Sequence, residues 1–242
     1  MFQHFKSWPV IVIAALLTAC ASPVPKIDVA KGGMADIITV AVIVPPEPAE
    51  YSVMNFGHGG MGFGLIGGLV AAADQADKQK RLALKYKSEG VAVNAELGNR
   101  IAAALNAAGY AARIETGNWV NAGNAQTLAF DKIQSDADAV LVVSPSIVGF
   151  VAAGHAVRNN DYLPTLSVVT NLLGRNRTAT PLYRGFHMTG WEMKQEGWRY
   201  TAPKRQFSDF ASLHDGSKES AQSLSEAASL IAATVATDLR QQ

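Results

Sequence analysis

Two segments of the chain carry apolar residues at helical spacing. In the first, one stripe is formed by Val93, Leu97, Ile101, Leu105 and Ala108, and Gly109 follows as a C-cap. In residues 217–239 a second stripe is formed by Leu224, Ala228, Ile231, Val235 and Leu239, which predicts a C-terminal amphipathic helix. From Leu65 a strongly polar segment predicts a further, solvated helix that Gly90 interrupts.

Five other segments have the pattern of β-strands. Residues 36–46 form a β-branched run that ends at two prolines, and residues 110–116 alternate between apolar and polar positions. The clearest core strand lies at Ala139–Val143, within residues 137–153. Residues 162–174 and 179–191 predict two more strands, joined by a polar hairpin turn at 174–178.

The stretches between these strands are less regular. We expect a loop at residues 47–55 and a short helix near 125–134. The order of elements predicts an α/β or α+β fold, with a single sheet of about five strands and helices packed on it. Trp191, Trp198 and Tyr200 follow the last strand, as core lids or rim anchors.

A glycine-rich segment, residues 56–73, has three interpretations. Gly60, Gly64 and Gly68 recur every four residues, and the segment resembles the glycine zippers of bacterial envelope proteins, which implies an oligomer or membrane contact. The spacing Gly62, Gly64, Gly67 fits a nucleotide-binding loop by letter, but it lies far beyond the strand that should precede it. Our default is a loop that leads into a helix packed through its glycine face.

The composition narrows the range of partners. The chain has 242 residues, of which 21 are basic and 20 acidic, so there is no global field to attract nucleic acid. Hydrophobic residues make up 48%, which indicates a packed globular domain. The single cysteine, Cys20, excludes an intrachain disulfide.

The first residues have the pattern of a secretory signal peptide. A flank containing Lys6 precedes an apolar run, and small residues lead to Cys20. The run is shorter than the roughly 20 residues that a membrane-spanning helix needs. We therefore predict a signal peptide at residues 1–19, a tether at 20–35, and a folded domain at 36–242 with a glycine-rich insertion at 56–73.

The sequence Leu17-Thr18-Ala19-Cys20 resembles the lipobox of bacterial lipoproteins. The resemblance implies that the sulfur of Cys20 receives a diacylglycerol, that cleavage precedes Cys20, and that Ala21 favours the outer membrane, with the protein on the periplasmic side. The order of elements is loosely similar to the periplasmic α/β domains of other envelope lipoproteins.

No arrangement of residues in the sequence is typical of catalysis. The histidines lack metal-ligand spacing, and we predict no catalytic residue, no metal and no cofactor. Arg175 and Arg177, in the predicted hairpin turn, are candidates for binding an acidic partner, whereas Asp136 and Asp138 fit solvated turn positions.

Three functional hypotheses follow. The first is a binding, scaffolding or envelope-assembly role, with the membrane contacted through lipid on Cys20 and with an envelope protein or a second copy as partner. The second is a subunit of an export or transport complex whose residues 53–73 contact the membrane. The third is a periplasmic hydrolase, which requires Ser144 or Ser146 beside His155 or His187.

Overall fold

The computed structural model describes residues 24–30, 32–57, 64–122, 125–152, 161–177, 180–190 and 197–240. In chain order the elements are β1 (Thr39–Ile43), β2 (Ser52–Asn55), α2 (Gly64–Glu89), α3 (Val93–Ala107), β3 (Ala111–Ile114), β4 (Trp119–Ala122), β5 (Ala125–Leu128), the 3-10 turn η2 (Phe130–Lys132), β6 (Ala139–Ala152), β7 (Tyr162–Leu173), β8 (Tyr183–Thr189), β9 (Trp198–Thr201), α4 (Phe210–Asp215) and α5 (Ser217–Asp238).

The main sheet is mixed and has seven strands, in the order β3-β1-β6-β7-β8-β9, with β2 as a second partner of β6. The strands β1 and β2 run parallel to β6, at its start and at its end respectively. The long strand β7 is antiparallel to both of its neighbours, β6 and β8, and β9 runs parallel to β8 at the edge. The prediction of about five strands is therefore wrong in number, because the four-residue strands β2 and β9 also join the sheet.

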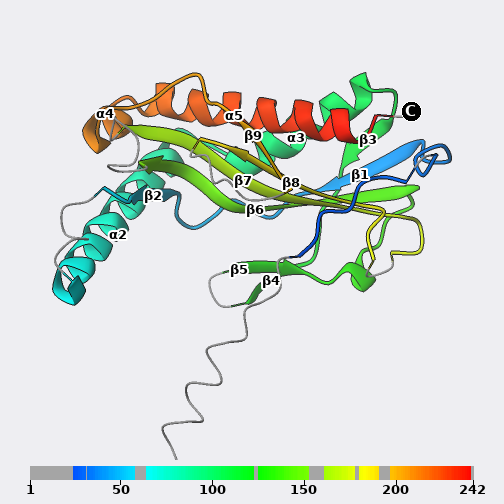
Figure 1. Ribbon diagram of the computed structural model, residues 1–242, viewed down its shortest axis with the longest axis horizontal. Helices are drawn as coiled ribbons and strands as arrows, with labels where there is room; N and C mark the ends of the chain where they lie inside the picture. The colour runs from blue at the N-terminus through cyan, green and yellow to red at the C-terminus, as the bar shows by residue number, and fades with distance from the viewer. Residues whose placement is uncertain are drawn as a thin grey trace, which may run out of the picture.

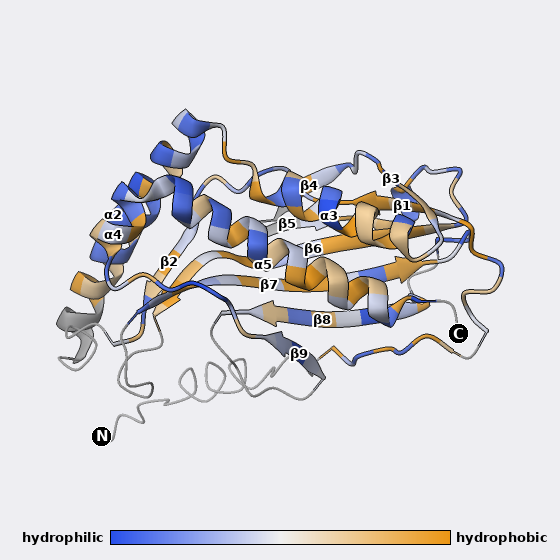
Figure 2. Cartoon of the chain, turned by 90° about the horizontal axis from the view of Figure 1, so that it is seen from above, coloured by the Kyte–Doolittle hydropathy of each residue, from blue (hydrophilic) through white to orange (hydrophobic). Residues whose placement is uncertain are grey.

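Two helices, α3 and α5, lie along one face of the sheet (Figure 1). Figure 2 shows from above that these two helices lie over the strands. The predicted stripe residues are fully buried at Leu97, Ile101 and Leu105 in α3, and at Leu224 and Val235 in α5. The main core thus lies between this helical layer and the sheet.

The opposite face of the sheet is partly covered by the hairpin β4–β5 (Figure 1). Trp119, Leu128 and Phe130 pack there against a smaller core that includes Val140 and Leu173. Of the short helix expected near 125–134, only the three-residue 3-10 helix η2 is present, and residues 125–128 form β5 instead. We use the terms helical face and hairpin face for the two sides of the sheet.

The predicted tether is also too long. Ile27 exchanges two backbone hydrogen bonds with Arg184 of β8, at 3.1 and 2.8 Å, and Met34 is buried in the main core. The folded body therefore begins before residue 36, because Ile27 and Met34 belong to it.

Candidate functional site

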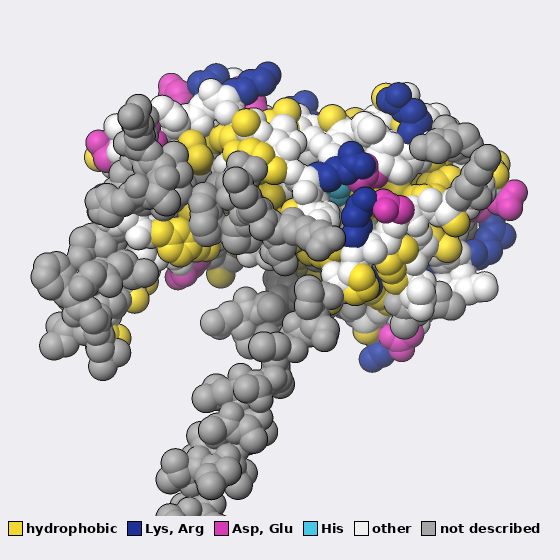
Figure 3. All heavy atoms as spheres, in the orientation of Figure 1, with side chains coloured by type: hydrophobic (Ala, Val, Ile, Leu, Met, Phe, Trp, Pro, Cys, Tyr) yellow, Lys and Arg dark blue, Asp and Glu magenta, His cyan; other side chains and the backbone are white. Residues whose placement is uncertain are grey.

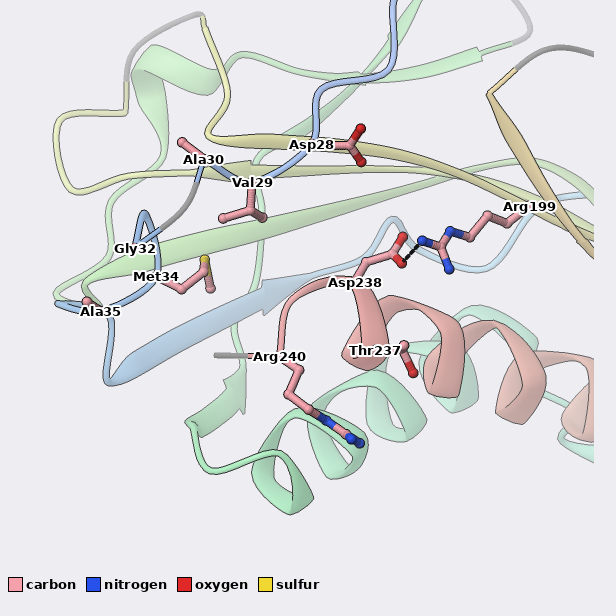
Figure 4. A pocket seen from close by; sticks show the side chains of 10 residues that line it. All are labelled: Asp28, Val29, Ala30, Gly32, Met34, Ala35, Arg199, Thr237, Asp238 and Arg240. Atoms are coloured by element: carbon pink, nitrogen blue, oxygen red, sulfur yellow. Dashed lines mark ion pairs between the residues drawn. The ribbon is translucent and has the colours of Figure 1, made fainter. Parts of the chain in front are cut away.

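A pocket of about 600 Å³ opens where the N-terminal segment meets the end of α5. Figure 4 shows its lining residues: Asp28, Val29, Ala30, Gly32, Met34 and Ala35 from the N-terminal segment, Arg199 from β9, and Thr237, Asp238 and Arg240 from the end of α5. The pocket thus joins segments from both ends of the chain with the last strand of the sheet. It lies on the helical face, because α5 provides one of its walls.

An ion pair lies in this pocket. Arg199 Nη2 is 2.6 Å from Asp238 Oδ1, and the Asp238 side chain is only 3% exposed whereas that of Arg199 is 46% exposed. Arg240 lines the same pocket and forms no ion pair within the described part of the chain. The lining also includes Asp28, whose carboxylate pairs with Lys26, so two acidic and two basic side chains line the pocket.

Behind the ion pair, a hydrogen-bonded chain enters the core. The Tyr183 hydroxyl donates to Asp238 Oδ2 at 2.8 Å, and its oxygen lies 3.1 Å from His187 Nε2. Thr170 Oγ1 is 3.3 Å from the same nitrogen. Since the Tyr183 proton goes to Asp238, the His187 tautomer that fits this chain carries its proton on Nε2 and donates it to the Tyr183 oxygen.

Strand alternation and one glycine allow Tyr183 and His187 to form these hydrogen bonds. Tyr183, Gly185 and His187 occupy alternate positions of β8 and so point to the same face of the sheet. A Cβ atom on residue 185 would lie 2.0 Å from the Tyr183 hydroxyl and 2.6 Å from His187 Nε2. Gly185 therefore provides the space in which the two side chains meet.

The surroundings fix the protonation states of both groups. Burial, and then the nearby charges of Arg199 and Lys26, lower the pKa of His187 to about 3, so its imidazole is neutral at pH 7. Burial and the Asp238 carboxylate raise the pKa of Tyr183, so its hydroxyl stays protonated. His187 is 1% exposed, and its Nδ1 has no hydrogen-bond partner among the described residues. His187 lies in the core and does not line the pocket. A ligand in the pocket would therefore meet the guanidinium groups of Arg199 and Arg240 and not the imidazole.

The serines of the hydrolase hypothesis do not meet His187. Ser146 Oγ donates to Ser167 Oγ at 2.8 Å. Ser167 lies between Leu166 and Val168, which face the helices, so Ser167 and Ser146 lie on the hairpin face. His187 contacts Thr170 and Tyr183 on the helical face. Ser144 follows Val143 of the main core and also points to the hairpin face, and His155 lies outside the described residues.

The two arginines of the hairpin turn are occupied within the fold. Arg177 donates through its guanidinium to the backbone carbonyls of Gly174, Ser135 and Ala137. Arg175 pairs with Asp138. Arg177 is thus held by backbone carbonyls, whereas the Arg175 side chain, paired with one carboxylate, is still 75% exposed.

Asp138 acts as a structural acceptor. Its Oδ2 accepts from the backbone amides of Ile38 and Thr39, at 3.1 and 2.9 Å, and from Thr39 Oγ1 at 2.8 Å. These bonds, together with Arg175, hold the pKa of the Asp138 carboxyl well below its usual range. Asp138 thus joins the start of β1 to the start of β6, while Asp136 pairs with Arg113.

The glycine-rich segment is only partly described. Gly64 and Gly68 lie in the first turns of α2, whereas Gly60 and Cys20 lie outside the described residues. In these turns Leu69 and Val70 are 64% and 59% exposed. Within the described ranges no helix has the length and apolar character needed to cross a bilayer. The same ranges contain no cluster of three or more His, Cys, Asp or Glu side chains that could bind a metal.

The chain matches no protein-family model, no curated protein and no solved structure. The sequence patterns did not predict Arg199, Tyr183 or Asp238 as site residues. The only local signal was the alternation of Tyr183, Gly185 and His187 along one strand. Their partners come from the last strand and the last turn of the final helix, which only the fold brings together.

Proposed function

We propose that this chain is an outer-membrane lipoprotein, anchored through lipid on Cys20, whose periplasmic domain has a binding or envelope-assembly role. The observation that carries the proposal is Leu17-Thr18-Ala19-Cys20 behind an apolar run. Two or three acyl chains hold a protein firmly on a bilayer, whereas one does so only marginally. A lone thiol converted to a thioether is also protected from oxidation.

The pocket at the end of α5 is the candidate binding site for this role. Its lining combines two arginines, Arg199 and Arg240, with two carboxylates, and Val29 and Met34 contribute an apolar wall. This mixture suits a small ligand that has both polar and apolar parts. The buried chain behind Asp238 keeps Arg199 in place through its ion pair.

Mass spectrometry of protein purified from membranes tests the anchor. We expect a mature chain that begins at Cys20 and carries diacylglycerol, and a Cys20→Ser variant that is neither acylated nor recovered with membranes. An unmodified thiol or an uncleaved leader in the native protein would overturn the proposal.

A second candidate function is a subunit of an export or transport complex in which residues 53–73 contact the membrane. The exposed Leu69 and Val70 favour it, because an apolar pair beside glycines is costly to leave in water. Protection of this segment from protease in proteoliposomes supports the candidate, and complete cleavage rejects it. A matched control replaces both residues with serine, which should abolish the protection.

A further inference from the structure

The N-terminal segment crosses the edge of the sheet at Ile27. Its backbone pairs there with Arg184 of β8. On one side of this crossing, the Arg184 guanidinium donates to the carbonyl of Pro25 at 3.4 Å. On the other side, Val29 packs against the main core beneath the helices. Residues 25 and 29 therefore lie on opposite faces of the sheet.

Strand alternation shows on which face Pro25 lies. Arg184 Nε donates to Asn171 Oδ1 at 2.8 Å. Asn171 lies between Thr170 and Leu172 of β7, and Leu172 belongs to the core under the helices. Asn171 and Arg184 therefore point to the hairpin face, and so the chain that leads to Cys20 leaves the body on that face.

The number of residues between Cys20 and Pro25 limits how far Cys20 can lie from the point where the chain leaves the hairpin face. Five peptide units separate Cys20 from Pro25, and a fully extended chain spans at most about 3.6 Å per residue. The Cα of Cys20 thus lies within about 18 Å of Pro25 in any conformation. The β4–β5 hairpin stands roughly 10 Å from the main sheet, since stacked sheets pack about that far apart. The reach of the tether is therefore of the same order as the thickness of the hairpin layer.

The hairpin face carries aromatic side chains near this exit. In β9, Trp198 and Tyr200 are paired with Phe186 and Met188 of β8, and Arg199 between them points to the helical face to reach Asp238. Trp198 and Phe186 pack with ring centroids 5.3 Å apart. Tyr200 is 36% exposed. Tryptophan and tyrosine are enriched where a membrane meets water, because each ring has an apolar body and a polar end.

The first turns of α2 project toward the same side. In Figure 1 this end of α2 extends past the sheet on the side of β4 and β5, away from α3 and α5. It carries the exposed Leu69 and Val70. The space-filling view also shows hydrophobic side chains at the surface, beside basic and acidic ones (Figure 3).

We propose that the hairpin face rests on the bilayer surface, with the aromatic side chains of β9 and the first turns of α2 at the level of the lipid head groups. The inference rests on the proposed lipidation of Cys20, because the short tether then holds this face close to the membrane. The helical face and its pocket point away from the bilayer.

A fluorescent label tests this orientation. In the proposed lipoprotein the sulfur of Cys20 is acylated and does not react. A Tyr200→Cys variant therefore carries one reactive thiol, which is labelled with a nitrobenzoxadiazole dye. The matched control is Ala233→Cys, an exposed position of α5 on the other face. Both are reconstituted into vesicles of phosphatidylethanolamine and phosphatidylglycerol that contain a doxyl-labelled phosphatidylcholine. We expect several-fold stronger quenching at residue 200 than at residue 233.

The outcomes separate the two proposals. Protein that floats with the vesicles but shows equal quenching at both positions overturns the orientation and leaves the anchor intact. Protein that does not float overturns both. Because the Tyr200 hydroxyl donates to the Gly190 carbonyl at 2.6 Å, the substitution could impair folding. Tryptophan quenching by brominated lipids in the unsubstituted protein then decides the question, since Trp198→Phe must remove much of it.

Discussion

Acidification from pH 7 to pH 5 should destabilise the protein through His187. This imidazole is 1% exposed and neutral, and its ring faces Thr170 and Tyr183, with the charges of Arg199 and Lys26 nearby. No carboxylate is within hydrogen-bond distance of it in the described part of the chain, because Tyr183 lies between the ring and Asp238. A proton on His187 would therefore be buried without an acceptor of opposite charge.

The size of the effect follows from the two pKa values. The pKa is about 3 in the folded protein and 6.5 in the unfolded chain. Between these values only the unfolded state binds the proton, so this contribution to stability is complete above pH 6.5 and is lost as the pH falls. Each pH unit below 6.5 lowers the free energy of unfolding by about 1.4 kcal/mol, which amounts to about 2 kcal/mol at pH 5.

The assay is urea unfolding followed by circular dichroism at pH 7, 6 and 5, for the native sequence and for His187→Gln. Glutamine does not titrate, so we expect the variant to be less stable at pH 7 but to lose about 2 kcal/mol less between pH 7 and pH 5. The difference between the two slopes excludes the contributions of carboxylates, which both proteins share. Parallel slopes would refute a buried, neutral His187.

Three further substitutions test the fold around the site. Tyr183→Phe should cost about 1–3 kcal/mol in urea unfolding, because Asp238 loses its buried donor; no change would contradict the hydrogen-bonded chain. Gly149→Ala places a methyl group 2.0 Å from the Ser52 carbonyl oxygen and should release β2, with faster amide exchange at 52–55 and a loss of about 1–3 kcal/mol. Asp138→Asn should weaken the acid dependence of stability below about pH 4, because the carboxylate stabilises the fold above its ordinary pKa and loses this effect on protonation; an unchanged acid transition would contradict this role.

The long elements could be predicted because they repeat one pattern over many residues. In α3 the four-residue spacing of Leu97, Ile101 and Leu105 matches their complete burial. The predicted core strand at Ala139–Val143 is the start of β6, which continues to Ala152. Its second half escaped prediction because Pro145 and the adjacent bulge interrupt the alternation.

The short strands β2 and β9 gave no such signal. The four residues of β2 have a position in the sheet only because β1 covers the first part of β6 and leaves Gly149–Ala152 without a partner on that side. Gly149 has φ 151° and leaves room for the close approach of Ser52, a role that sequence spacing does not reveal. The edge strand β9 likewise exists because β8 offers it an open edge.

The candidate site shows the same limit. Tyr183, Gly185 and His187 share a strand face by simple alternation, but Asp238 reaches them from the last turn of α5 and Arg199 from β9. Pairing between residues so far apart in the sequence depends on strand order and on which face the final helix covers. Neither the strand order nor the face that α5 covers can be read from a local sequence pattern.

The N-terminal segment connects the two proposals physically. Its proline and glycine content suggested a tether, yet its residues form one wall of the pocket and one edge of the sheet. The described part of the segment passes from the hairpin face at Pro25 to the helical face at Val29, so it leads from the face proposed for the anchor to the face that carries the pocket. A lipid on Cys20 would thus hold the domain with its pocket open to the solution. Two backbone hydrogen bonds at Ile27 fix the point at which the segment changes face.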